Sequence, residues 1–65
     1  MPIVTVQLEK RSQVFPLIFE AGKHGLETEE MAGNQVEIVG DETKIGYVLD
    51  KIPAKIIHKE RFKYV

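Results

Sequence analysis

The sequence predicts one small α+β domain, dominated by strands, that spans residues 1–65. Apolar and polar residues alternate on both sides of Gly40-Asp41-Glu42-Thr43, which indicates a central β-hairpin over residues 36–50. An N-terminal and a C-terminal run alternate in the same way and predict two further strands. The stretches between them are typical of one or two short helices. A chain of 65 residues makes one domain at most.

The predicted hairpin has one apolar face. Its residues are Val36, Ile38, Ile45, Tyr47 and Leu49. We expect the rest of the chain to cover this face, which would make it the core.

The N-terminal strand is predicted over residues 3–9, because Val4, Val6 and Leu8 all point to one side. After a polar break, residues 13–20 fit two structures. Leu17 and its apolar neighbours fit one face of a helix, with Ser12 as the N-cap. Pro16 and the β-branched and aromatic residues equally fit an edge strand.

Residues 28–33 predict one or two helical turns, with Thr28 as the cap and Gly33 at the C′ position. Pro53 interrupts regular pairing because it has no backbone donor. Residues 55–65 then predict the C-terminal strand. Read as extended chain, it places Ile56, His58, Phe62 and Tyr64 on one side.

The composition limits the chemistry. There is no cysteine, so neither a disulfide nor a thiolate zinc site can form. The two histidines, His24 and His58, are too few for a closed structural zinc site, so we expect no metal and no cofactor. So small a domain buries only roughly 60% of its unfolded surface, which favours help from a partner or a homo-oligomer. Without a long apolar run or a signal-peptide pattern, we expect a cytoplasmic protein with no membrane partner.

Charge is distributed unevenly, although the net charge is −1. Residues 20–42 carry seven acidic side chains against Lys23, a local sum of −6. Residues 51–65 carry five basic side chains against Glu60, a local sum of +4. Two interpretations remain open: the asymmetry marks an interaction surface, or the two segments lie together and neutralise each other.

The C-terminal strand carries the candidate binding residues. In extended conformation they point to one side at intervals of about 7 Å, close to the spacing of successive phosphates. These residues are Lys55, Lys59, Arg61 and Lys63. We therefore expect a binding module that contacts nucleic acid or an acidic protein surface, largely without sequence preference.

The C-terminal third resembles the zinc-binding segment near the N-terminus of an insertion-sequence transposase family. The matching elements are Lys44-Ile45-Gly46, then Leu49-Asp50, Pro53-Ala54, His58, Arg61 and Lys63-Tyr64. The resemblance implies an accessory segment that contacts DNA. The zinc-binding cysteines of that family are absent here, so no zinc role is carried over.

Residues 1–8, Met-Pro-Ile-Val-Thr-Val-Gln-Leu, are similar to the start of 4-oxalocrotonate tautomerases. This resemblance implies an alternative function as an enzyme. Pro2, freed by removal of Met1, would act as general base, and Arg11 would hold a carboxylate substrate. A structural or oligomeric interaction protein is the third alternative. No phosphate loop, Ser-His-Asp set or metal dyad points to another catalytic class.

Overall fold

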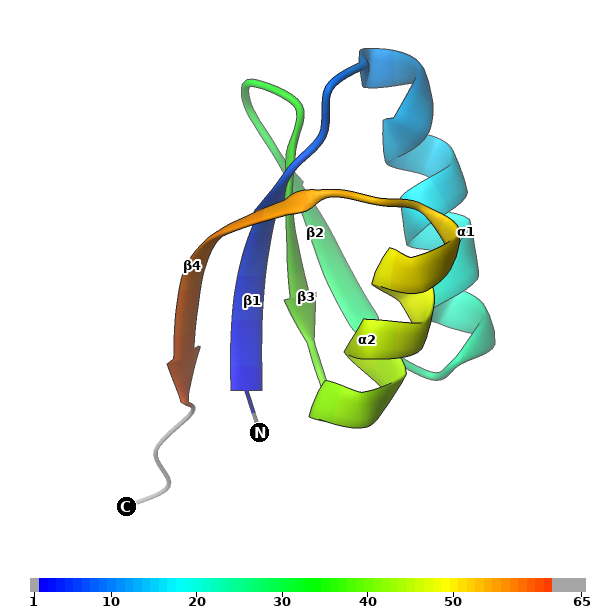
Figure 1. Cartoon of the computed structure of the whole chain (residues 1–65), viewed down its shortest axis with the longest axis vertical. Coiled ribbons are helices and arrows are strands. Elements are labelled where there is room, and N and C mark those ends of the chain that lie inside the picture. Colours follow the sequence, from blue (N-terminus) through cyan, green and yellow to red (C-terminus); the bar gives the residue numbers. More distant parts are fainter. Residues whose placement is uncertain (1, 62–65) are drawn as a thin grey trace.

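The computed structural model describes residues 2–61. Its elements, in chain order, are β1 (Pro2–Gln7), η1 (Arg11–Gln13), α1 (Val14–Lys23), β2 (Glu27–Met31), β3 (Gln35–Val39), α2 (Glu42–Lys51) and β4 (Lys55–Arg61). The four strands form one antiparallel sheet in the order β2-β3-β1-β4, and both helices lie on the same face of it (Figure 1). This order of elements, with β3 and β1 at the centre of the sheet, is the ferredoxin-like, or split β-α-β, topology.

The predicted α+β class is confirmed, as are the N-terminal strand and, up to Arg61, the C-terminal strand. The predicted dominance of strands is not seen, because helices and strands cover nearly equal lengths of chain. Residues 62–65, to which the predicted last strand extended, lie outside the described residues.

The hairpin predicted over residues 36–50 is wrong in its second half, which forms α2. The Asp41 carboxylate accepts a hydrogen bond from the backbone N–H of Lys44 at 3.2 Å and so caps the helix. Ile45 and Val48, three residues apart, are buried against the sheet, as helical spacing requires. Tyr47, which the strand pattern assigned to the core, is 55% exposed.

The hairpin of this fold is β2–β3, and the helical turns predicted over residues 28–33 are wrong. Residues 27–31 pair with β3 along their whole length. Met31 pairs with Gln35, so residues 32–34 form the hairpin loop, in which Gly33 and Asn34 both have positive φ, 76° and 59°. Gly33 therefore turns a hairpin instead of ending a helix.

Residues 14–23 are helical, which decides between the two structures that the sequence left open. Pro16 fits because it lies in the first turn, where backbone N–H groups have no partner within the helix. Ser12 is not the cap, since it lies within η1 and the N-cap position of α1 is Gln13. Val14, Leu17 and Ala21 face the sheet and are buried.

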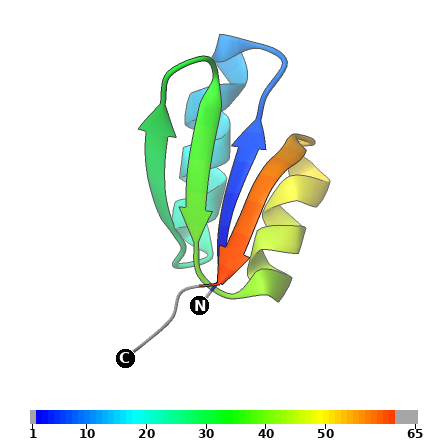
Figure 2. The same ribbon diagram turned by 90° about the vertical axis from the view of Figure 1, so that its left-hand side faces the viewer.

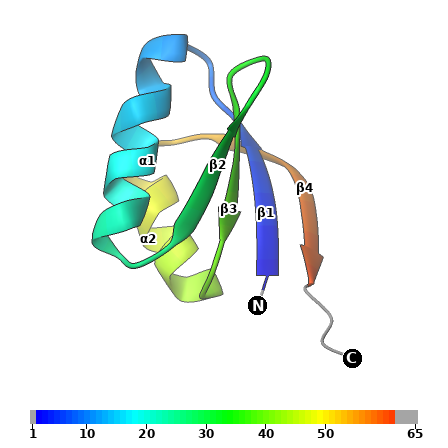
Figure 3. The same cartoon turned by 180° about the vertical axis from the view of Figure 1, so that it is seen from behind.

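The core lies between the sheet and the helices. It consists of Val4, Val6, Leu8, Val14, Leu17, Ala21, Leu26, Val36, Ile38, Ile45 and Val48. The opposite face of the sheet is not covered by any described element (Figure 2). The molecule thus has two layers with two outer faces, one of strands and one of helices (Figure 3).

A β-bulge interrupts the pairing of β4 with β1. Val6 pairs with Ile56 and Thr5 pairs with His58, so Ile57 is the extra residue. Because the bulge shifts the register by one residue, side chains before and after it exchange faces. This shift decides how the basic residues of β4 are arranged.

Candidate functional site

The predicted row of basic residues on β4 is broken by the bulge. Lys55 pairs with Gln7 and lies on the open face of the sheet. Lys59 pairs with the buried Val4 and therefore lies on the helical face. The prediction that these two lysines share one side is wrong, because it assumed uninterrupted alternation. Arg61 pairs with Pro2 at the end of β4, and Lys63, Phe62 and Tyr64 lie outside the described residues.

Two ion pairs join the acidic and the basic segments of the sequence. The Lys59 ammonium lies 3.0 Å from the Glu42 carboxylate, and the Lys51 ammonium lies 3.8 Å from that of Glu20. These contacts favour the interpretation that the two segments partly neutralise each other. Each pair is exposed on at least one side, so its contribution to stability is small.

The open face of the sheet is acidic. The strand registers place four carboxylates on it, against one lysine, Lys55. The acidic residues are Glu27, Glu29, Glu37 and Glu60. Since like charges repel, this face disfavours phosphate.

The alternative catalytic residues lie apart. Pro2 begins β1, and Arg11 follows its far end. The five residue steps of strand from Pro2 to Gln7 alone span roughly 17 Å. The Arg11 guanidinium lies 3.4 Å from the Glu30 carboxylate instead. The structure does not bring these two residues together as one site.

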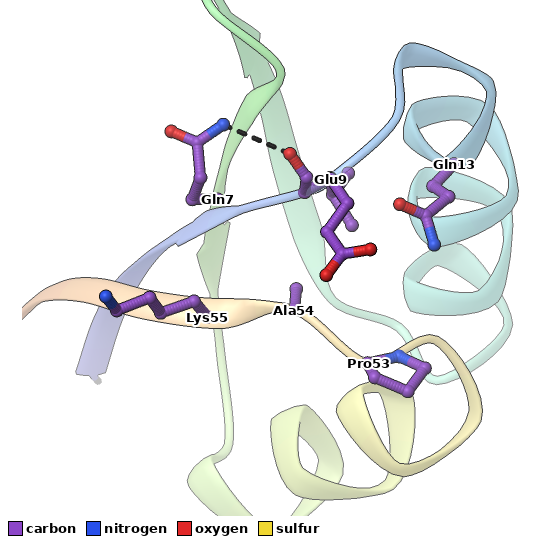
Figure 4. A pocket seen from close by; sticks show the side chains of 7 residues that line it. Gln7, Glu9, Gln13, Pro53, Ala54 and Lys55 are labelled. Carbon is purple, nitrogen blue, oxygen red and sulfur yellow. Dashed lines mark hydrogen bonds between the residues drawn. The ribbon is translucent and has the colours of Figure 1, made fainter.

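A groove of about 610 Å³ lies between the loop that follows β1 and the segment that leads into β4 (Figure 4). Leu8, Pro53 and Ala54 supply apolar surface, and Glu9 and Gln13 point toward it (Figure 4). The side-chain amide oxygen of Gln13, Oε1, already accepts a hydrogen bond from the backbone N–H of Lys10. The groove therefore offers one carboxylate (Glu9), one ammonium group (Lys55) and two amides (Gln7 and Gln13), a set without a hydroxyl, thiol or imidazole nucleophile.

A polar cluster joins the two helices. Glu20 is half-buried, and its carboxylate lies 3.5 Å from the His24 imidazole and 3.8 Å from the Lys51 ammonium. The His24 ring packs against Tyr47, with 6.0 Å between the ring centroids. The cluster thus connects the C-terminal end of α1 with α2 through one exposed ion pair and one ring contact.

The outer face of α1 is aromatic. Phe15 is 77% exposed and Phe19 is 69% exposed, one helical turn apart. Gly22 continues the same stripe, since positions i, i+4 and i+7 share one side of a helix. Pro16 and Lys23 flank it, and the Lys23 ammonium lies 5.0 Å from the centre of the Phe19 ring. We call these five residues the aromatic face of α1.

Gly22 has no local reason to be glycine. Its φ is not positive, and a Cβ added there would meet no atom within 4 Å. Glycine inside a helix costs about 0.5–1 kcal/mol relative to alanine. Because Gly22 has no side chain, it leaves a flat area of helix backbone beside the two large rings, which we call the Gly22 shelf.

Reasoning from sequence missed this surface. It treated residues 13–20 as either a helix or an edge strand, and it examined only the buried side of that helix. The signal was present, however, because residues 14–19 of α1 are all apolar, and a helical segment that is apolar all round is normally buried. In this fold the sheet can cover only one of those sides.

In comparisons with known proteins, no family model, no curated protein and no solved structure matches this chain. Within residues 2–61, neither helix is long and apolar enough to cross a membrane. The same residues contain no cluster of three or more histidine, aspartate or glutamate side chains able to hold a metal ion.

Proposed function

We propose that this chain is a non-enzymatic protein-binding module that docks through the aromatic face of α1. The observation that carries the proposal is the exposure of Phe15 and Phe19 on a helix whose residues 14–19 are all apolar. Exposed aromatic residues in one contiguous patch are typical of protein–protein interfaces, where they act as anchors.

The two side chains contribute little to the packing of the isolated domain. Neither belongs to the core, and the hydrogen bonds of α1 do not depend on them. Leaving two large rings in water is unfavourable, which is why monomeric proteins rarely group them. A partner that covers the helix removes that cost.

Photocrosslinking tests the proposal. Replacing Phe15 with benzoylphenylalanine keeps an aromatic ring at the docking surface. In cells that naturally make the chain, we expect a discrete protein adduct, identified by mass spectrometry. The control places the same group at Glu29, on the open face of the sheet, where we expect none. Equal labelling at both positions, or no adduct at position 15, would contradict the proposal.

The basic edge of β4 supports a second candidate, contact with nucleic acid or an acidic protein surface. Its support is that Lys55 has no ion pair among the described residues and that Ile56 and Ile57 leave the edge accessible. On duplex DNA, we expect a dissociation constant of roughly 10⁻⁴–10⁻⁶ M at physiological salt.

Salt dependence tests this candidate. The double variant Lys59→Ala with Arg61→Ala should reduce the slope of log K against log[salt] by about two. Lys10→Ala with Lys44→Ala removes the same charge away from β4 and should leave the slope unchanged. Equal effects of the two double variants would mean that net charge alone governs binding.

A further inference from the structure

We infer that the partner is a second copy of this chain, and that two α1 helices pack antiparallel about a two-fold axis near Phe19. This inference rests on the proposed function and names the occupant of the same surface. Three properties of the aromatic face support it: its shape, its charge and its area.

The shape of the face suits an antiparallel pair. Its N-terminal half is large, with Phe15, and its C-terminal half is small, with Gly22. Antiparallel packing about Phe19 brings residue 15 of one copy beside residues 22 and 23 of the other. Each Phe15 ring then lies on the Gly22 shelf of the opposite copy. A parallel pair would place the two Phe15 rings together and leave a gap between the two glycines.

Charge favours the same arrangement. Lys23 is the cation of the aromatic face, and its ammonium already lies over an aromatic ring in its own chain. In an antiparallel pair Lys23 also approaches the Phe15 ring of the other copy, a favourable cation–π geometry. In a parallel pair the two Lys23 side chains would meet and repel. The dipoles of antiparallel helices also attract each other.

The area matches a weak dimer. An aromatic side chain contributes about 150–250 Å², so the exposed parts of Phe15 and Phe19 amount to about 300 Å² on each copy. A two-fold contact uses this surface twice, and the flanking Pro16, Gly22 and the stem of Lys23 bring the total to about 1,000 Å². That is the lower bound for a specific interface, so we expect a dissociation constant on the order of 10⁻⁵–10⁻³ M.

Sedimentation equilibrium from micromolar to millimolar concentration tests the inference. The weight-average mass should rise from 7.4 kDa toward twice that value. The double variant Phe15→Ser with Phe19→Ser should remain monomeric with an unchanged circular dichroism spectrum. A parent chain that stays at the monomer mass at millimolar concentration would overturn the inference.

Gly22→Leu provides the sharper test, because its two expected effects have opposite signs. The leucine favours helix and its Cβ meets no atom within 4 Å, so the urea midpoint of the dilute monomer should rise. It also fills the shelf for the opposite Phe15, so the dimer should weaken at least tenfold. Gly46→Leu is the matched control: Gly46 is equally open but lies on α2, so only the midpoint should rise. Unchanged dimerisation of Gly22→Leu would rule out this packing.

The two proposals can fail separately. A crosslinked adduct at position 15 with a different protein, combined with a monomeric parent chain, would retain the protein-binding function and reject self-association. A dimer that forms equally well without Phe15 and Phe19 would reject self-association through this face, whereas the absence of any adduct at position 15 would reject both.

Discussion

Leu17 and Phe15 are two residues apart on α1 and have opposite environments. Leu17 is fully buried in the core, whereas Phe15 is 77% exposed. The side chain inside the core loses its packing contacts when truncated, and the one outside does not. Leu17 thus belongs to the residues that stabilise the fold, and Phe15 to the residues that the proposed interface uses.

Leu17→Ala should therefore lower the free energy of unfolding by about 2–5 kcal/mol. Phe15→Ala should change it by less than about 0.5 kcal/mol in dilute solution, although it removes more atoms. Urea titration of both variants at micromolar concentration measures this. A large loss for Phe15→Ala would show that the ring packs within its own chain.

Gly40 is a position where the backbone requires glycine. Its φ is +152°, and an added Cβ would collide with the side chain of Leu26, which is only 7% exposed. Gly40→Ala should destabilise the fold by roughly 1–3 kcal/mol through strain and overpacking. Gly46→Ala, in open space on α2, should instead stabilise it by up to about 1 kcal/mol. Thermal melts of the two variants should thus shift in opposite directions.

At the scale of elements, α2 shows where the sequence is ambiguous. The apolar residues between positions 45 and 49 fit both a strand with period two and a helix with its face at positions 45, 48, 49 and 52. The choice depends on Asp41, whose carboxylate caps the helix, and on the sheet that the face covers. The Asp41 cap can be recognised in the sequence. The sheet that the helix covers forms only after β1, β3 and β4 have assembled.

The cap gives a prediction for α2. Asp41→Ala should cost about 0.5–2 kcal/mol, because the backbone N–H of Lys44 loses its acceptor. Asp41→Asn keeps an acceptor oxygen and should recover most of that loss. Thr43→Ala, at an exposed position of the same turn, should stay within about 0.5 kcal/mol of the parent. A loss that Asp41→Asn does not recover would assign the effect to charge and not to the cap.

The N-terminal strand and the start of β4 were predictable, because simple alternation over a long run has few alternatives. The arrangement of the basic residues was not. A single extra residue, Ile57, moves Lys59 to the other face of the sheet, and no local sequence pattern predicts this bulge. The aromatic face was predictable in principle, since Phe15 and Phe19 stand at helical spacing on the side opposite Leu17.

For the whole molecule, dimerisation should stabilise the fold by mass action. A ligand that binds only the native state raises the melting temperature, and here the ligand is a second copy. We expect the melting temperature of the parent chain to rise between about 10 μM and 1 mM. The double variant Phe15→Ser with Phe19→Ser should melt at the same temperature throughout that range. Differential scanning calorimetry at several concentrations measures both.

The bulge in β4 has a consequence for solubility. An edge strand with regular pairing is a template on which identical chains add without limit and form fibres. Here Ile57 breaks the edge of β4, and Lys59 adds a charge that points inward. The opposite edge, β2, carries Glu27, Glu29 and Glu30, which repel an identical strand. Addition of further chains to the sheet is therefore disfavoured at both edge strands. Association through the helical side, by contrast, ends with a dimer.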